Sequence, residues 1–596
     1  MKNRIGVYIC HCGGNISDYV DVEKVRQAVE HEDGVVLSKT TMFACSDSNQ
    51  NEMVNDIKDY GLDGVIVASC SPKLHLTTFR NVTERGDLNK YTYVHANIRE
   101  QASWAHSDDT EGATEKAIHL VKAAIAKSRY AEPLYTNQFE AEKTIAVIGA
   151  GVAGLKAAIS LSDKKSTVIL IEKENKVGGH TAEWGDLFMS DEKGNELINR
   201  IYSDLAQREN VTILMGAEVI SSKGSIGNFT LKIRKRPINE GDPMEIMEVN
   251  VGSVVVATGF DHYVPQKGEF DYMINDNIIT LPEFKQLVDK STGNRLMYKG
   301  KEINNIAYIY CVGSRQENGE NTYCSRFCCT SVIHTAIVAK KKFKNINNFH
   351  LNRGIRTYGK QELLYAESLE LGDIYLQFDY NNPPQITSEG KKTVVTVKDI
   401  LSAGKELAVE TDLIVLVTGM VPRADQSIGS MFKIPKGRDK FYNEIHVKLR
   451  PVETVIDGIT IAGACQGPKN ISESVNSALA AATKSYSYIS KGTLETEPIV
   501  AEINQDLCVW CGKCQEACPF DAIEKQVLNG KPNGLEVHDA LPSNIEKQEL
   551  NGKPIAVVNT SVCKGCGMCA PVCPEDAINL IGYTSEEIMS MIDVLA

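Results

Sequence analysis

Short apolar runs alternate with helix-like patterns along the first part of the chain. The runs at residues 5–10, 35–43 and 64–69 have the length and the β-branched content of buried strands. Between the first two, residues 22–29 carry apolar side chains three and four positions apart, which predicts an amphipathic helix. Strands that alternate with helices indicate a small α/β domain with a parallel sheet, which we place at residues 1–135.

A second alternating series follows a helix pattern that runs from residue 113 to residue 130. An apolar strand pattern at residues 144–148 leads into a glycine-rich turn and then into another helix pattern. The sequence therefore predicts an α/β multidomain protein in which parallel sheets recur. Further strand patterns lie at residues 168–172, 254–259, 305–310, 411–419 and 458–465.

Composition and charge narrow the class of protein. A chain of 596 residues is too long for one core and predicts three to five domains. Hydrophobic residues make up 42% and charged residues 24%, as in globular proteins, and a formal charge of −13 argues against nucleic acid or an anionic membrane as partner. No apolar run approaches the roughly 18 residues that a spanning helix needs, and the apolar part at the start of the chain is too short for a secretory signal. We expect a cytoplasmic protein with no membrane span.

Seventeen cysteines are many for a cytoplasmic protein. A reducing compartment disfavours structural disulfides, which leaves metal binding as the more common role. Iron-sulfur clusters use thiolates in fours, and the cysteines fall into groups of four, four, one and eight. These are Cys10, Cys12, Cys45 and Cys70; Cys311, Cys324, Cys328 and Cys329; Cys465; and Cys508, Cys511, Cys514, Cys518, Cys563, Cys566, Cys569 and Cys573.

The last eight cysteines form two runs of the pattern C-x2-C-x2-C-x3-C-P, which is typical of two-cluster bacterial ferredoxins. Three cysteines of each run can bind three corners of one [4Fe-4S] cluster, while the fourth points to the other cluster. Zinc sites or disulfides are the alternatives, but zinc does not need the trailing Cys-Pro. The motifs predict an α+β ferredoxin domain at residues 495–596, with a polar insertion at residues 529–553. We assign Cys508, Cys511, Cys514 and Cys573 to one cluster, and Cys563, Cys566, Cys569 and Cys518 to the second.

The first four cysteines each come at or just past the end of a predicted strand. Parallel α/β sheets bind ligands at the carboxyl ends of their strands, so these thiols are expected at one edge of the sheet. We interpret Cys10, Cys12, Cys45 and Cys70 as a further [4Fe-4S] site. The alternative is that they are small buried hydrophobic residues, a common role for free cysteine.

The glycine-rich turn has the order G-x-G-x-x-G, with Gly149, Gly151 and Gly154. Such glycines let the backbone approach a pyrophosphate, which rests on the N-terminus of the following helix. Glu172 lies 23 positions after Gly149, at the end of the next strand pattern, where an acid accepts the ribose hydroxyls of a dinucleotide. The alternative is a tight turn without a ligand.

Three further segments resemble motifs of flavoproteins with two dinucleotide-binding domains, of the thioredoxin reductase kind. They are Val177-Gly178-Gly179-His180, Ala257-Thr258-Gly259 and Ala462-Gly463-Ala464-Cys465. The family's aspartate after Ala-Gly is missing here, and Cys465 either contacts the flavin or ribityl chain or is a small residue in a tight turn. The resemblance implies an FAD domain at residues 140–265 and 410–490. Its expected FAD contacts are Gly149, Gly151, Gly154, Glu172, Lys173, Gly178, Gly179, His180, Val219, Ala257, Thr258, Gly259, Gly463, Ala464 and Cys465.

Residues 266–409 resemble the second dinucleotide domain of the same flavoproteins in a degenerate form. After the strand pattern at 305–310, residues 311–315 hold one glycine where a pyrophosphate loop needs three, so ordinary nicotinamide binding is not expected. Neighbouring Cys328 and Cys329 are expected to point in different directions. We interpret Cys311, Cys324, Cys328 and Cys329 as a cluster site, with a redox-active thiol pair as the alternative.

Nearly the whole chain resembles the A-type subunit of heterodisulfide reductase, an iron-sulfur flavoprotein. Besides the ferredoxin motifs, the specific matches are Cys10-His11-Cys12-Gly13, Phe43-Ala44-Cys45-Ser46-Asp47, Ala68-Ser69-Cys70-Ser71-Pro72, Asn97-Ile98-Arg99-Glu100-Gln101, Cys311-Val312-Gly313-Ser314-Arg315 and Tyr323-Cys324-Ser325-Arg326-Phe327-Cys328-Cys329. The resemblance implies an oxidoreductase of anaerobic metabolism in which FAD bifurcates or confurcates electron pairs through [4Fe-4S] clusters. It also implies B-type and C-type partner subunits, a hydrogenase or formate dehydrogenase type donor, ferredoxin, and a homodimer within a hetero-oligomer. The chain resembles a short form, because residues 231–254 look like a cysteine-free hairpin turning at 239–243 where longer members insert a ferredoxin module.

Three other functions remain open at this point. One is an NAD(P)H:ferredoxin-type oxidoreductase resembling the small subunit of glutamate synthase, although the degenerate loop at 311–315 counts against it. Another is electron delivery to a different complex, such as a quinone-linked module of sulfate reducers or a benzoyl-CoA reductase. A third is a scaffold whose N-terminal domain docks partner subunits. The motifs do not give the direction of electron flow, because the environment sets cluster potentials.

Overall fold

The computed structural model describes residues 4–136, 138–188, 190, 192–237, 244–389, 392–527 and 554–595. The insertion predicted at 529–553 and the hairpin turn predicted at 239–243 lie outside these residues. The chain folds into two compact units, Met1–Phe139 with Glu495–Ala596, and Glu140–Leu494. The finer division into four domains stays a prediction.

The N-terminal part of the first unit is a four-stranded parallel sheet in the order β2-β1-β3-β4. Central strands β1 and β3 are buried along their whole length, as their continuous apolar runs predict. The strands are β1 (Ile5–Cys10), β2 (Val35–Thr41), β3 (Gly64–Ser69) and β4 (Tyr93–Asn97), and the helices are α1 (Val22–Val29), α2 (Asp47–Asp59), α3 (Pro72–Arg85) and α4 (Thr110–Tyr130). Shorter turns are η1 (Cys12–Gly14), η2 (Lys90–Thr92) and η3 (Arg99–Ser103).

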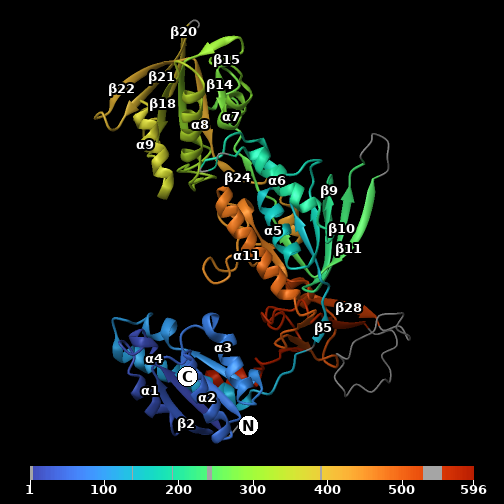
Figure 1. Ribbon diagram of the computed structural model, residues 1–596. Helices are drawn as coiled ribbons and strands as arrows, with labels where there is room; N and C mark the ends of the chain where they lie inside the picture. The colour runs from blue at the N-terminus through green and yellow to red at the C-terminus, as the bar shows by residue number, and fades with distance from the viewer. Residues whose placement is uncertain are drawn as a thin grey trace. The chain divides into compact units, whose positions relative to one another are not determined.

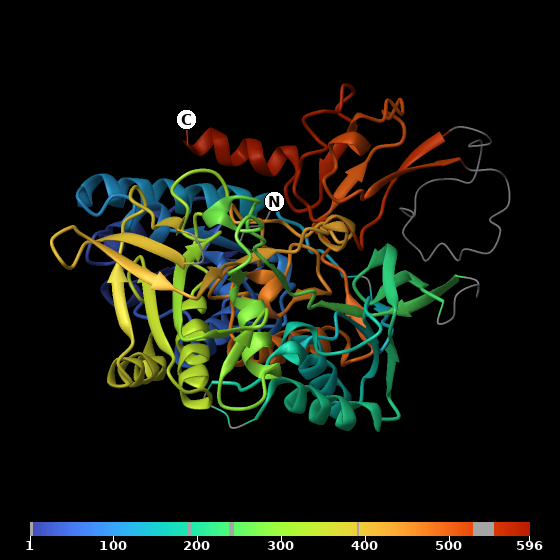
Figure 2. The ribbon, with the colours of Figure 1, turned by 90° about the horizontal axis from the view of Figure 1, so that it is seen from above.

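The C-terminal part of the first unit consists of two short antiparallel strand pairs and two helices. The pairs are β27 (Ala501–Ile503) with β30 (Ile578–Leu580), and β28 (Ile523–Val527) with β29 (Pro554–Val558). The helices are α12 (Lys513–Ala517) and α13 (Ser585–Leu595). Helix α13, red in Figure 2, packs along α4, which is blue.

The second unit contains a five-stranded parallel sheet in the order β25-β12-β6-β7-β8. Helices α5 and α11 pack side by side against it, and a three-stranded antiparallel sheet, β11-β10-β9, is inserted in the chain between β8 and β12 (Figure 1). The strands are β6 (Thr144–Ile148), β7 (Thr167–Ile171), β8 (Val211–Leu214), β9 (Ala217–Ser225), β10 (Asn228–Lys235), β11 (Glu245–Val251), β12 (Ser253–Val256) and β25 (Ile459–Ile461). The helices are α5 (Val152–Asp163), α6 (Gly194–Ala206) and α11 (Ile471–Ile489).

A second five-stranded parallel sheet of this unit has the order β14-β23-β17-β18-β19. Its strands are β14 (Ile278–Thr280), β17 (Asn305–Val312), β18 (Asn347–Asn352), β19 (Ile374–Gln377) and β23 (Leu413–Thr418), with helices α7 (Leu281–Lys290), α8 (Cys328–Lys342) and α9 (Glu362–Glu370). An antiparallel sheet of β20 (Gln385–Glu389), β21 (Lys392–Asp399) and β22 (Lys405–Thr411) precedes β23 in the chain. Strand β17 extends through Cys311 to Val312, so Cys311 belongs to the strand and not to the loop after it.

Smaller elements complete the second unit. Strands β13 (Phe260–His262) and β24 (Met420–Pro422) pair antiparallel, and β15 (Leu296–Tyr298) pairs with β16 (Lys301–Ile303). The remaining helices are α10 (Ser427–Met431), η4 (Gly179–Glu183), η5 (Glu269–Asp271), η6 (Gly359–Gln361) and η7 (Gly463–Gln466). Short strands β5 (Gln138–Glu140) and β26 (Thr493–Glu495) lie where the chain passes from one unit to the other. Across the described residues, no helix combines the length and apolar character needed to cross a membrane.

Candidate functional site

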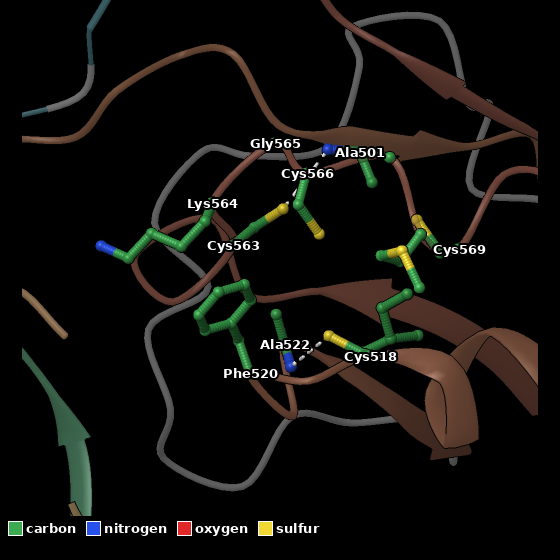
Figure 3. Close-up of a pocket in the computed structure, with 12 residues that line it drawn as sticks. Ala501, Cys518, Phe520, Ala522, Cys563, Lys564, Gly565, Cys566 and Cys569 are labelled. Atoms are coloured by element: carbon green, nitrogen blue, oxygen red, sulfur yellow. Dashed lines mark hydrogen bonds between the residues drawn. The ribbon is translucent and has the colours of Figure 1, made fainter. Parts of the chain in front are cut away.

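The four cysteines assigned to the second ferredoxin cluster line one pocket in the first unit. Cys518 comes from the first motif, and Cys563, Cys566 and Cys569 come from the second (Figure 3). The backbone N–H of Ala522 donates to Cys518 Sγ at 3.3 Å, and a second backbone N–H donates to Cys563 Sγ at 3.5 Å. Hydrogen bonds of this kind stabilise thiolate sulfur and tune cluster potentials.

The other four ferredoxin cysteines line a second pocket. Cys508, Cys511 and Cys514 come from the first motif and Cys573 from the second. The N–H of Ala577 donates to Cys573 Sγ at 3.3 Å, which repeats the contact made by the N–H of Ala522 in the first pocket. The structure therefore brings together the same two sets of four that the motif spacing predicts.

Buried thiols in these pockets must lose protons before they bind iron. Burial raises the pKa of Cys569 to about 11 and also raises the pKa of Cys514. Metal binding to thiols releases protons, so cluster assembly becomes more favourable as pH rises. In the described part of the chain, no three His, Cys, Asp or Glu side chains are grouped closely enough to bind one metal ion. A [4Fe-4S] cluster needs wider spacing than a single ion, because its four thiolates bind four separate irons.

The glycine turn between β6 and α5 has the geometry of a pyrophosphate site. A Cβ on Gly154 would lie 1.8 Å from the Gly149 carbonyl oxygen, so only glycine fits there. Gly149 adopts φ +100°, which favours glycine as well. Around Gly151 the space is open within 4 Å, and α5 begins after it without a side-chain cap. An open helix N-terminus of this kind suits a phosphate group.

Glu172 lies at the end of β7 beside this turn. Its buried carboxylate accepts the Ala150 N–H at 2.6 Å and the Glu174 N–H at 2.9 Å. A carboxylate has about four lone-pair sites, so capacity remains for ribose hydroxyls. Half-buried Lys173 follows it. Val219 lies in β9 with its side chain in the apolar core, 4% exposed.

The segment of Gly178, Gly179 and His180 contacts the glycine turn. The Gly178 N–H donates to the Ala150 carbonyl at 2.7 Å, and a Cβ on Gly179 would lie 3.5 Å from Gly151 Cα. His180 Nε2 lies 3.0 Å from the carbonyl oxygen of Phe260, which follows the Ala257-Thr258-Gly259 segment. The predicted flavin residues from three separate segments therefore meet at one end of this sheet.

Cys465 is buried in η7, which lies between β25 and α11 in the chain. Its thiol donates to the carbonyl oxygens of Ala462 at 3.1 Å and Val256 at 3.4 Å. Burial raises its pKa, while the ammonium of Lys469 acts in the opposite direction. The Gly463 N–H donates to Ser477 of α11 at 2.8 Å, and Ala464 is also buried. These contacts account for a small residue at Cys465, and its contact with a flavin stays a prediction.

The second dinucleotide-like fold brings Cys311, Cys324, Cys328 and Cys329 into mutual electrostatic range. Cys311, the residue before the last of β17, has φ +63°, and the Arg326 N–H donates to Cys324 Sγ at 3.3 Å. A side-chain hydrogen bond joins Cys328 and Cys329 and lowers the pKa of Cys329 to about 7, with the nearby Arg315 and Arg356 acting in the same direction. Cys329 is buried and Cys328 is half-buried. Neighbouring positions of a helix differ by about 100°, and the expectation that the two side chains point in different directions stays a prediction.

The N-terminal cysteines gather at the carboxyl edge of the first sheet. Cys10 is the last residue of β1, and its Sγ accepts the N–H groups of Cys12 at 3.3 Å and Ala44 at 3.4 Å. Arg99 Nη1 donates to Cys12 Sγ at 3.4 Å. Cys70 directly follows β3, where burial raises its pKa to about 11 against the opposing charge of Arg99. Cys45 follows β2 and interacts electrostatically with Cys10.

Two family descriptions match parts of the chain. Residues 143–298 match the pyridine nucleotide-disulphide oxidoreductase family, and residues 507–580 match the 4Fe-4S double cluster binding domain. An iron-sulfur A-type subunit of the CoB--CoM heterodisulfide reductase of Methanopyrus kandleri is 35% identical over 89% of this chain and 92% of its own length. The chain belongs to the family of heterodisulfide reductase A-type subunits.

Other A-type subunits of heterodisulfide reductase are similar over the same extent. The A-type subunit of the H(2):CoB-CoM heterodisulfide,ferredoxin reductase of Methanothermobacter thermautotrophicus is 34% identical over 87% of this chain and 90% of its own length. Among solved structures, T. acidophilum thioredoxin reductase covers 58% of this chain and 99% of its own, at 20% identity and a TM-score of 0.40.

Family membership confirms several expectations from the sequence. The chain is an oxidoreductase with FAD and with two [4Fe-4S] clusters in its C-terminal part. Its fold class, an N-terminal α/β part, a two-dinucleotide-domain flavoprotein core and a ferredoxin part, is also confirmed. The individual ligand and flavin residues stay predictions.

Several residues that contact the thiols escape the pattern analysis. Arg99 follows β4 and donates to Cys12 Sγ. It lies in the segment at residues 97–101, one of the family matches in the sequence, so this match could have indicated it. Arg315 and Arg353 act together on Cys311, with Arg315 Nη1 3.9 Å from its sulfur. No local pattern marks Arg353, because it reaches this place from the loop after β18.

Proposed function

We propose that this chain is the electron-bifurcating or confurcating subunit of a cytoplasmic heterodisulfide-reductase-like complex. The observation that carries the proposal is the grouping of sixteen of its seventeen cysteines into four sets of four in a chain that also contains a flavoprotein core. Two sets lie in the ferredoxin part, one at the edge of the N-terminal sheet and one in the second dinucleotide-like fold. The four corresponding segments, 1–135, 140–265 with 410–490, 266–409 and 495–596, act as domains in this proposal.

FAD supplies the step that iron-sulfur clusters lack, because it exchanges electrons in pairs or singly while each cluster transfers one. The chain's own residues hold and insulate these groups. The turn at Gly149–Gly154 receives the pyrophosphate, Glu172 orients the ribose, and the four thiol sets hold cubes. The N–H groups and guanidinium groups beside sulfur stabilise negative charge there and thereby raise the potential of each cluster.

The partners follow from the same family. We propose B-type and C-type subunits, ferredoxin, and a hydrogenase or formate dehydrogenase type donor, with two copies of this chain in the hetero-oligomer. The supporting observation is that one relative is named as part of an "H(2)/formate:CoB-CoM heterodisulfide,ferredoxin reductase". Exposed apolar side chains beside the ferredoxin pockets, such as Val509 at 64% and Met568 at 55%, fit docking of redox partners.

A nicotinamide-dependent reaction is the competing function, and the Cys311 loop speaks against it. Gly313 is its single glycine, and Tyr263 packs so closely that a Cβ on Gly313 would lie 2.0 Å from the ring. The Gly313 segment therefore lacks the open space found at Gly151.

The test is anaerobic reduction of the purified chain, followed by flavin absorbance. Reduced ferredoxin should bleach the flavin, whereas NADH and NADPH should leave it oxidised. Bleaching by either nicotinamide would overturn the proposal in favour of an NAD(P)H:ferredoxin-type oxidoreductase. Failure of reduced ferredoxin to bleach the flavin would point to electron delivery by another donor class, as in a benzoyl-CoA reductase type complex.

A further inference from the structure

A stack of three polar rings is buried in the second five-stranded sheet, away from the glycine turn. Tyr308 of β17, His350 of β18 and Tyr375 of β19 occupy directly paired positions on adjacent strands. The His350 ring stacks on Tyr308 with centroids 4.8 Å apart and on Tyr375 at 4.5 Å. His350 is 0% exposed. A fully buried histidine in the middle of a sheet needs polar partners to offset its desolvation.

Charged and polar groups surround the far side of this histidine. Asp373, with a side chain that is 0% exposed, accepts hydrogen bonds from Lys340 Nζ of α8 at 2.9 Å and from Asn348 at 2.9 Å. Its other oxygen accepts Ser368 Oγ of α9 at 2.6 Å. Lys340 is 18% exposed, so it connects this carboxylate with solvent. The network therefore extends from the surface to His350.

The near side of His350 leads toward the Cys311–Cys329 thiols. The Tyr310 hydroxyl lies 2.9 Å from His350 Nδ1, and Tyr310 precedes Cys311 in β17. Tyr310 also lies within electrostatic range of Cys328 and Cys329 at the start of α8. His350 Nε2 is buried without a hydrogen-bond partner, with the nearest carboxylate oxygen of Asp373 at 3.5 Å. This nitrogen points toward a negative charge without bonding to it.

We propose that His350 takes up one proton when the iron-sulfur group held by Cys311, Cys324, Cys328 and Cys329 accepts one electron. The inference deepens the proposed function, because it rests on a cluster at those thiols. In the balanced step, one electron passes from the reduced flavin of the chain to this group. One proton passes from solvent, by way of Lys340 and Asp373, to the imidazole. The added negative charge at sulfur is thereby matched by one positive charge on His350. One O–H bond of a solvent donor breaks and one N–H bond of the imidazole forms, while no bond to carbon or sulfur changes.

The groups that face His350 suit it to hold this proton. From β17 they are the neutral hydroxyls of Tyr308 and Tyr310, and from β19 that of Tyr375, because burial raises the pKa of all three phenols well above the usual value. From the β19 edge and α8 they are Asp373 and Lys340. A protonated imidazole would direct one N–H at Tyr310 and the other at Asp373, so both have an oxygen acceptor.

The resting charges are consistent with an imidazole that is neutral before reduction. Burial lowers the pKa of His350, although Asp373 acts against this effect. Burial also raises the pKa of Asp373, but the interaction with His350 at 3.5 Å and the hydrogen bonds from Ser368 and Lys340 outweigh that contribution and lower the pKa to about 2. Asp373 and Lys340 therefore form a neutral pair, and the buried site has no net charge until an electron arrives.

The test is the midpoint potential of this group as a function of pH, followed by its electron paramagnetic resonance signal in the full-length holoprotein. The signal is identified by its loss in Cys324→Ala. Between about pH 6 and pH 8, the range in which histidine titrates, the wild-type potential should fall by up to about 59 mV per pH unit, the value for one electron and one proton. His350→Gln should remove most of this slope.

Two matched tyrosine variants test which hydroxyl stabilises the protonated imidazole. Tyr310→Phe removes the oxygen that accepts one N–H of the protonated imidazole, so it disfavours protonation of His350 and should flatten the slope as His350→Gln does. Tyr308→Phe removes a hydroxyl that donates to Asn348 instead, so its slope should match wild type. The proposal fails if the wild-type potential is independent of pH or if Tyr310→Phe and His350→Gln keep the wild-type slope. Absence of any signal that depends on Cys324 overturns both the cluster and the relay, whereas a signal without pH dependence overturns the relay alone.

Discussion

Cys518 and Cys573 exchange places between the two ferredoxin motifs. Each follows three cysteines of its own motif in sequence, yet lies in the pocket lined by the three cysteines of the other. The swap ties the motifs together, because neither pocket has four thiols without both segments. A substitution of Cys518 or Cys573 is therefore expected to remove the cluster of the pocket that this residue lines, and not the cluster held by the other cysteines of its own motif.

Replacing Cys518 with alanine tests this exchange. Cys518→Ala should remove the signal of the cluster held by Cys563, Cys566 and Cys569, because that cluster loses one of its four thiolates. The matched variant Cys573→Ala should remove the signal of the other cluster. Electron paramagnetic resonance of the two reduced variants distinguishes them. If each variant lost the cluster of its own motif, the assignment would be reversed.

Alanine substitutions at Gly151 and Gly154, three positions apart, should have different effects on FAD affinity and on the stability of the apoprotein. Gly151→Ala meets open space at an ordinary φ of −71°, so the apoprotein should melt as wild type does. Its methyl group stands where the pyrophosphate should lie, and FAD affinity should fall at least ~10-fold, about 1.4 kcal/mol. Gly154→Ala forces a Cβ to 1.8 Å from a carbonyl oxygen and should lower the melting temperature of the apoprotein as well. Wild-type FAD binding by Gly151→Ala would place the pyrophosphate elsewhere.

At the scale of elements, the contact between α4 and α13 joins the N-terminal and C-terminal parts of the first unit. Lys127 of α4 is largely buried, with its Nζ 3.2 Å from the ring centroid of Tyr583, which precedes α13. Burial lowers the pKa of Lys127 to about 8, against the opposing charge of Glu587 on α13. Glu587 is 2% exposed, so the lysine partly neutralises a buried carboxylate.

Reversing the charge at Lys127 should release α13 from α4. Lys127→Glu places a second carboxylate near buried Glu587, a loss on the order of 3 kcal/mol or roughly 100-fold in exchange protection of α13. Hydrogen exchange measured by mass spectrometry reports this protection directly. Lys116→Glu, on the exposed part of the same helix, is the control and should leave α13 protected. Equal protection in both variants would show that the Lys127 contact does not hold the helices together.

Elements whose structure is set by their own sequence can be predicted, whereas elements that form by pairing with other segments cannot. Strands β1 and β3 are continuous apolar runs, and their observed bounds match the prediction because both faces are buried. The apolar pattern does not reveal the β20–β22 sheet, because its strands carry many polar residues and form by pairing with each other. Cys311 is expected in a loop from the strand pattern at 305–310, although it lies in β17.

The same contrast applies to the candidate site, where some groups of residues come from one short segment and others come from strands far apart in the sequence. Motif spacing predicts both ferredoxin pockets, because three of four thiols in each come from one short segment. The Tyr310–His350–Asp373 network cannot be predicted in this way. Its members become neighbours only through the register of the parallel sheet, which pairs β17 with β18 and β18 with β19. No composition or periodicity marks such a network.

At the scale of the whole molecule, the number of clusters decides what the protein can do. Two clusters and FAD would make a short chain of carriers with one exit. Four clusters would give the flavin separate routes for single electrons, which bifurcation requires. The two sets of four cysteines that include Cys10 and Cys311 therefore decide the function. If both sets bind clusters, the protein can send electrons along separate routes; if neither does, it is a simple electron carrier.

The most direct measurement is the content of iron and flavin per polypeptide in anaerobically purified protein, followed by electron paramagnetic resonance during stepwise reduction. Four [4Fe-4S] sites and one flavin predict about sixteen irons and one FAD per chain, with four distinguishable reduction steps. About eight irons, with signals from the ferredoxin part alone, would contradict the proposal. The N-terminal and Cys311 groups would then be packing residues or reactive thiols.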